Sequence, residues 1–199
     1  MNNIIFDLDF LKKLIYFWIA TPILAFLLSI LFCYLINVII NFFKLNLFQI
    51  DYQIRISLVF FGCLAAFALG SNLTASIVGI YSPYLDLNIK FLNLLFIISE
   101  EKLYFFGSLL IGIGALLFSQ KIAQTVGSQI SKINPVAALA ILITQIIILL
   151  CFSSQLIIDY LNFALPFDIF AIPLSASHIT FASIIGIASF NKFREVKPT

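Results

Sequence analysis

The feature that most constrains this chain is a series of long apolar runs. The first extends from Leu14 to about Phe43 without a charged residue. A helix of about 20 residues crosses the ~30 Å hydrocarbon core of a bilayer, so this run is long enough to span it. The chain of 199 residues is 62% hydrophobic and only 10% charged, whereas soluble domains are about a quarter charged. We therefore predict an all-α polytopic protein, multi-pass in the cell membrane (the inner or cytoplasmic membrane).

The second apolar run is interrupted by small polar residues. It covers residues 56–69, which is short for a span, and then meets Gly-Ser-Asn at residues 70–72. Continued to Gly79, it gives a full crossing with an irregular middle. Irregular backbone at membrane depth requires protein or a wet cavity around it. The alternative is a continuous helix whose small residues form a packing face.

The remaining runs are expected to complete about five to six transmembrane helices, with broken or re-entrant segments among them. Residues 103–118 and 135–152 are plain spans. Residues 91–98 form a short re-entrant or interfacial piece, and residues 166–188 are broken by polar residues. Within residues 103–118, Ser108 and Gly112 lie four residues apart with Gly107 and Gly114 nearby, and these small residues predict a close helix contact.

The two ends of the chain differ from its apolar middle. Residues 1–13 mix apolar and charged side chains, which predicts an amphipathic lead-in helix at the membrane interface. Residues 14–190 form the membrane domain, and residues 191–199 form a basic tail that we expect to be disordered. The net charge of +2 does not indicate a nucleic-acid partner. Lys and Arg occur in nearly every loop, so the positive-inside rule gives no orientation.

Sequence motifs for catalysis and metal binding are missing. There is no Gly-rich phosphate loop, no HExxH, no GxSxG and no CxxC. The single histidine has no neighbouring cluster of carboxylates or thiolates, and the three cysteines lie inside apolar runs as small hydrophobic residues. We therefore expect no enzymatic activity, no catalytic or metal-binding residues and no cofactor.

The polar side chains that interrupt the apolar runs are mostly hydroxyls and amides. They fall into three groups: Ser71, Asn72, Thr74 and Ser76; Thr125 and Ser128; Ser175, Ser177 and His178. A helix that begins inside the membrane presents N–H groups and a positive dipole end to an anion. Discontinuous helices of this kind build the sites of secondary transporters. In the alternative interpretation, the hydroxyls bond to their own helices and His178 caps or contacts a neighbouring helix.

Four motifs occur in a familiar order along the chain. They are FWIATP (17–22), LGSNLTASIVG (69–79), TVGSQISKINP (125–135) and IPLSASH (172–178), the last followed by IIGIA (184–188). This order resembles the C-terminal half of inorganic phosphate transporters of the PiT family. Their motifs read approximately SWxxSP, GANDVANAxGP, TIGxxIxxLxP and LPVSTTH. The resemblance implies an integral membrane carrier that couples phosphate uptake to sodium ions or protons.

Matched residue by residue, the resemblance also implies a phosphate site. Asn72 matches the first Asn of GANDVAN, and Thr125 matches the Thr of TIG. In the last motif, Ser175, Ser177 and His178 match the Ser, the second Thr and the His of LPVSTTH. The implied substrate-binding residues are Asn72, Thr125, Ser175, Ser177 and His178.

The departures from the family motifs concern ion coupling. Leu73 stands where the motif has Asp, Ser76 replaces its second Asn, and Ala176 replaces the middle Thr of STTH. In the family that Asp is tied to ion and phosphate handling. Its replacement leaves open an alternative, in which the chain is a degenerate non-transporting membrane subunit or a remnant of a transporter.

The family is built from two related halves in opposite orientations, with the site at their interface. The resemblance therefore implies one repeat of an inverted-repeat transporter, a half-transporter for phosphate or a related oxyanion. Its expected partners are the lipid bilayer, phosphate, and either a separate N-terminal half or an antiparallel second copy. The even spread of Lys and Arg permits insertion in both orientations. A sodium ion or a proton is the expected coupling ion.

Overall fold

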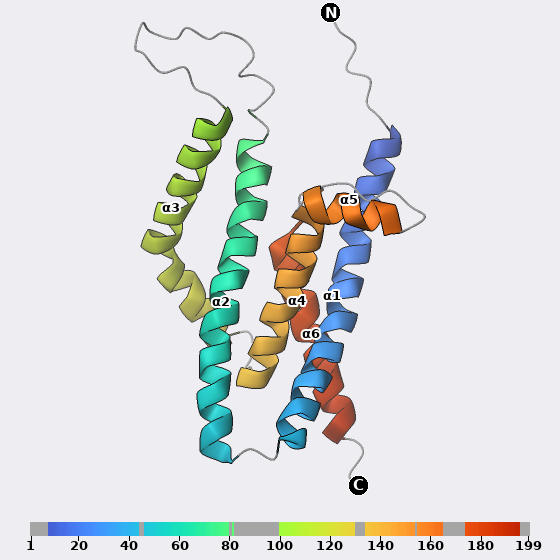
Figure 1. The fold of residues 1–199 in the computed structure, drawn as a ribbon, viewed down its shortest axis with the longest axis vertical. Helices are drawn as coiled ribbons and strands as arrows, with labels where there is room; N and C mark the ends of the chain where they lie inside the picture. The colour runs from blue at the N-terminus through green and yellow to red at the C-terminus, as the bar shows by residue number, and fades with distance from the viewer. Residues whose placement is uncertain are drawn as a thin grey trace, which may run out of the picture.

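Six helices and no strand occur in the part of the chain that the structure, a computed structural model, describes. The described residues are 8–43, 46–79, 81, 100–129, 134–153, 155–164 and 174–195. The helices are α1 (Leu8–Phe42), α2 (Leu47–Val78), α3 (Glu100–Gln129), α4 (Pro135–Ser153), α5 (Gln155–Ala164) and α6 (Ala176–Glu195). Five of them run roughly along the long axis of the molecule, and α5 lies across one end of α4 (Figure 1).

Four of the described helices are long and apolar enough to cross a bilayer. Their apolar parts are Leu14–Phe42, Phe48–Val78, Glu101–Gln120 and Pro135–Phe152. The apolar part of α6, Ala176–Phe190, is shorter. These helices confirm the predicted all-α polytopic membrane fold. The predicted start of α4 is also confirmed, since Asn134 Oδ1 accepts the Val136 N–H at 3.4 Å and Pro135 occupies the first turn.

The helix α2 runs without interruption through residues 70–72, so the break predicted there is wrong. Its hydroxyls bond to the helix itself. Ser71 Oγ donates to Ala68 O at 2.9 Å, and Ser76 Oγ donates to Asn72 O at 2.7 Å. Because each hydroxyl is satisfied by a carbonyl one turn earlier, small polar residues do not force the backbone out of the helix. The alternative of a continuous helix is the one observed.

The centre of the bundle is α4, which lies between α2 on one side and the pair α1 and α6 on the other (Figure 1). The most extensive helix contacts are those of α1 with α6 and of α2 with α4. The largest buried cluster joins Ala25 of α1, Ala68 of α2, Ile148 and Leu149 of α4, and Ile179 of α6. The span of α3, by contrast, has no buried residue. α3 is therefore held mainly by its contact with α2.

Two glycines allow the closest helix contacts. A Cβ at Gly186 would lie 2.6 Å from Ser29 Oγ and 2.7 Å from Phe26 O, so α1 and α6 touch through backbone at this point. A Cβ at Gly107 would collide with Val78, which brings α3 against α2. At Gly112 a Cβ would meet nothing within 4 Å. The close helix contact predicted for these small residues is therefore confirmed at Gly107 and not at Gly112 or Gly114.

The predicted ends of the chain are only partly described. α1 is continuous from Leu8 through the end of the predicted lead-in segment, and residues 1–7 lie outside the described residues. α6 continues to Glu195, so the disorder expected for residues 191–195 is wrong. The predicted re-entrant piece at residues 91–98 lies outside the described residues, as do residues 165–173.

Candidate functional site

Asn72 of α2 is hydrogen-bonded to Leu174, which lies two positions before the first residue of α6. Its side chain is 3% exposed. Asn72 Nδ2 donates to Leu174 O at 3.0 Å, and the Leu174 N–H donates to Asn72 Oδ1 at 3.4 Å. The side-chain amide of Asn72 thus bonds to both backbone groups of Leu174, which is buried and lies outside the helix, where no helical hydrogen bonds satisfy it. The position of the α6 N-terminus is therefore fixed by α2.

Ser175 is the N-cap of α6. Its Oγ accepts the His178 N–H at 3.4 Å, and its carbonyl accepts the Ile179 N–H at 3.2 Å. A serine oxygen bonded to the N–H three residues on is the common way to satisfy a donor at a helix start. The helix itself thus uses one acceptor of the Ser175 hydroxyl, and the hydroxyl can still donate.

Ser177 and His178 lie on the first turn of α6, and both are exposed. The first N–H groups of a helix have no acceptor within the helix, and the dipole gives this end a partial positive charge. The first turn of α6 therefore carries an exposed hydroxyl, an exposed imidazole and backbone N–H groups. This set can hold an oxyanion with neutral donors and the helix dipole.

Thr125 is not beside these residues. It lies on α3, whose side chains near this position are outside the described set. The antiparallel contact of Gly107 with Val78 sets the register between α3 and α2. Counted from that contact, residue 113 of α3 is level with Asn72 of α2. Thr125 lies 12 residues further along, near the C-terminal end of α3. At 1.5 Å per residue, the two positions are about 18 Å apart along the bundle.

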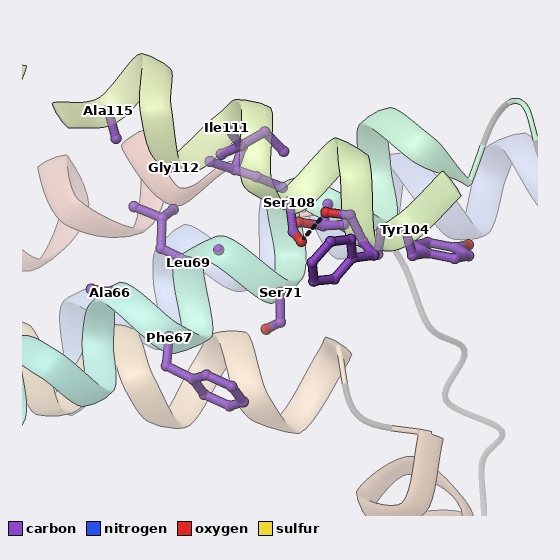
Figure 2. A pocket seen from close by; sticks show the side chains of 14 residues that line it. Ala66, Phe67, Leu69, Ser71, Tyr104, Ser108, Ile111, Gly112 and Ala115 are labelled. Carbon is purple, nitrogen blue, oxygen red and sulfur yellow. Dashed lines mark hydrogen bonds between the residues drawn. The ribbon is translucent and has the colours of Figure 1, made fainter. Parts of the chain in front are cut away.

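An open groove of about 760 Å³ lies between α2 and α3 (Figure 2). Most of its lining is apolar or small, and its hydroxyls come from Ser71, Thr74, Tyr104 and Ser108. The Ser108 hydroxyl bonds to Phe105 O of its own helix at 2.9 Å, as the dashed line in Figure 2 shows. The groove therefore offers open space and few free polar groups.

Leu73 also lines this groove. Successive helix residues are rotated by about 100°, so Leu73 and Asn72 face different neighbours. Asn72 faces the start of α6, and Leu73 faces the groove beside α3. In the described part of the chain, no group of three or more His, Cys, Asp and Glu side chains is placed to hold a metal ion.

The residue that sequence reasoning missed is Leu174. Its contribution is its backbone, and backbone groups carry no side-chain signal. The available clue was its position directly before Ser175, because the N–H and C=O of a residue outside the helix need partners elsewhere. The junction consists of Asn72, Leu174, Ser175 and His178. All of these except Leu174 were predicted as site residues, and so was the neighbouring Ser177.

Comparison with known protein families gives a match over most of the chain. The sequence model of the phosphate transporter family matches residues 46–199. This range contains α2 to α6, and so includes Asn72 and the first turn of α6. Comparisons with curated proteins and with solved structures give no match.

Proposed function

Because the chain belongs to the phosphate transporter family, which matches it over residues 46–199, we propose that it is one half of a carrier for inorganic phosphate. The family is one of transporters rather than enzymes. The chain is a multi-pass membrane protein, with four helices able to span a bilayer in its described part. We place it in the inner (cytoplasmic) membrane, with a sodium ion or a proton as the coupling ion. The observation that carries the proposal is the Asn72–Leu174 pair, which holds an exposed helix N-terminus in place.

The phosphate in this proposal binds at the first turn of α6. Ser177 Oγ and the His178 imidazole contact the phosphate oxygens, together with backbone N–H groups of the turn. Ser175 contributes its hydroxyl proton while its oxygen caps the helix. Neutral donors bind an oxyanion without a tight ion pair, which suits a substrate that must be released again. Asn72 acts indirectly, because its amide is already used on Leu174. A role for Thr125 stays a prediction from the resemblance.

The second half in this proposal docks beside α2 and α3. A Cβ at Gly70 or at Gly112 would meet nothing within 4 Å, although both glycines line the groove. Small residues on membrane helices let another helix approach closely. The open groove therefore supports a partner on this face, either a separate N-terminal half or an antiparallel second copy. Groups from that partner then complete the phosphate site at the exposed Ser177 and His178.

Replacing Ser177 with alanine is expected to weaken phosphate binding by about 2- to 10-fold, the loss of one neutral hydrogen bond worth about 0.5–1.5 kcal/mol. The measurement is binding of radiolabelled phosphate to the purified protein, followed by uptake into proteoliposomes. Thr180→Ala is the matched control on the same helix, since the Thr180 hydroxyl already donates to Ala176 O at 2.9 Å. Equal phosphate binding by wild type, Ser177→Ala and Thr180→Ala would contradict the site assignment.

A second candidate function is a membrane subunit that keeps the fold but does not transport. The observation that favours it is Leu73, an apolar residue facing the groove where the PiT resemblance would place an acid. Without that carboxylate, this half lacks the obvious ligand for a coupling cation. The two candidates differ in whether the wild-type chain moves phosphate.

Restoring the acid by Leu73→Asp is expected to create or raise cation-dependent phosphate uptake, provided that the second half is present. The new carboxylate would enter the groove near the hydroxyls of Thr74 and Ser108 and supply a cation ligand. The measurement is uptake in proteoliposomes with and without a sodium or proton gradient, and Leu73→Asn is the uncharged control. Full coupled uptake by the wild type, unchanged in Leu73→Asp, would exclude the non-transporting subunit.

A further inference from the structure

The helix α5 is too short to cross a membrane. It has 10 residues, Gln155–Ala164. At 1.5 Å per residue this is about 15 Å, half of the hydrocarbon thickness. It begins two residues after Ser153, where α4 ends, and the α4 span itself ends at Phe152. Figure 1 shows α5 lying across the end of α4 rather than continuing along it. The start of α5 is therefore at the level where a membrane span leaves the hydrocarbon core.

The sides of α5 have three different characters. Ile158 is 1% exposed and packs into the bundle. Tyr160 and Phe163, three residues apart, are 73% and 91% exposed. Asp159 and Asn162, also three apart, give another side its polar character. Among the described helices, α5 separates its polar and apolar residues most strongly. A helix with one side on protein, one apolar and exposed, and one polar fits the plane of the membrane interface.

Aromatic residues of α1 mark the same level. The rings of Phe17 in α1 and Phe152 at the end of α4 meet edge-on, with centroids 5.8 Å apart. Phe17 is flanked by Tyr16 and Trp18, both of which are exposed. Amphipathic aromatic rings prefer the headgroup region of a bilayer. α1 and the end of α4 thus place a membrane surface where α5 begins.

We propose that α5 is an interfacial anchor whose exposed side, Tyr160 and Phe163, lies among the phospholipid headgroups and upper acyl chains. The polar side with Asp159 faces water. The occupant of this surface in the proposal is the bilayer rather than a protein, because the end of the apolar α4 span and the aromatic residues of α1 both indicate a bilayer boundary at this height. This proposal concerns membrane placement and does not depend on phosphate.

The test uses the fact that Trp18 is the single tryptophan of the chain. The double variant Trp18→Phe, Phe163→Trp carries one fluorescent reporter on α5. It is reconstituted into phosphatidylcholine vesicles with bromine atoms either near the glycerol end or near the methyl end of the acyl chains. We expect the shallow bromines to quench this reporter several times more than the deep ones. The control, Trp18→Phe with Leu110→Trp, has its reporter on the exposed middle of the α3 span, and the order should reverse.

Three results would overturn the proposal. Quenching by aqueous iodide but by neither bromolipid would place α5 in water. Stronger quenching by the deep bromines would place it in the hydrocarbon core. Protection from both quenchers would show that a protein covers this side. If the Phe163→Trp variant does not reconstitute, Tyr160→Trp on the same side of α5 gives the same test.

Discussion

Asn72→Leu is expected to lose phosphate binding and to lower the melting temperature, because leucine keeps the volume but removes both hydrogen bonds to Leu174. The N–H and C=O of Leu174 are then buried without partners, at a cost of about 1–3 kcal/mol, and the start of α6 is no longer held. A cost of this size, where it falls on phosphate binding, corresponds to about 5- to 150-fold in phosphate affinity. The measurements are radiolabelled phosphate binding and thermal unfolding in detergent.

The matched control for this variant is Asn37→Leu in α1. Asn37 Nδ2 donates to Cys33 O at 2.7 Å, one turn earlier in the same helix. Its removal breaks a bond within α1 and leaves the Asn72–Leu174 pair intact, so phosphate binding should stay at the wild-type level. The conservative variant Asn72→Gln should recover part of the binding if its longer amide reaches Leu174. Wild-type binding and melting in Asn72→Leu would show that the Asn72–Leu174 pair does not support the site.

Gly186→Ala is expected to lower the stability of the protein, although it adds only one methyl group. Its methyl group would lie 2.6 Å from Ser29 Oγ and 2.7 Å from the backbone carbonyl of Phe26. A backbone atom cannot move aside as a flexible side chain can, so α1 and α6 must separate along the most extensive contact in the bundle. Overpacking of this kind costs about 1–3 kcal/mol. The measurements are the melting temperature and the monodisperse fraction after solubilisation.

Gly112→Ala is the matched control, and its effect should have the opposite sign. Nothing lies within 4 Å of its Cβ position, so alanine adds helix propensity worth up to about 1 kcal/mol without a clash. The isolated chain should therefore melt at the same temperature or higher. Equal melting of Gly186→Ala and Gly112→Ala would show that α1 and α6 do not approach through Gly186.

The small residues show which helix contacts can be predicted from the sequence and which cannot. The sequence predicted close helix packing at Gly107, Ser108, Gly112 and Gly114 without separating them, and of the three glycines only Gly107 contacts Val78 of α2. The choice depends on which face of α3 turns toward Val78, and a helix whose polar and apolar residues are not separated onto different sides carries no such signal. The same applies to residues 70–72, where hydroxyls predicted a break but bond to their own helix.

The apolar runs are sufficient to assign the class of the protein, because a bilayer admits few structures. Runs such as Leu14–Phe42 must form helices, since hydrocarbon cannot satisfy exposed backbone groups. The sequence motifs also indicated the family and the polar turn at Ser175, Ser177 and His178. That Asn72 holds this turn in place follows from the tertiary structure alone, because its hydrogen-bond partner is the backbone of Leu174, 102 positions away. Such a contact depends on how helices pack side by side, and no local pattern in a chain records that arrangement.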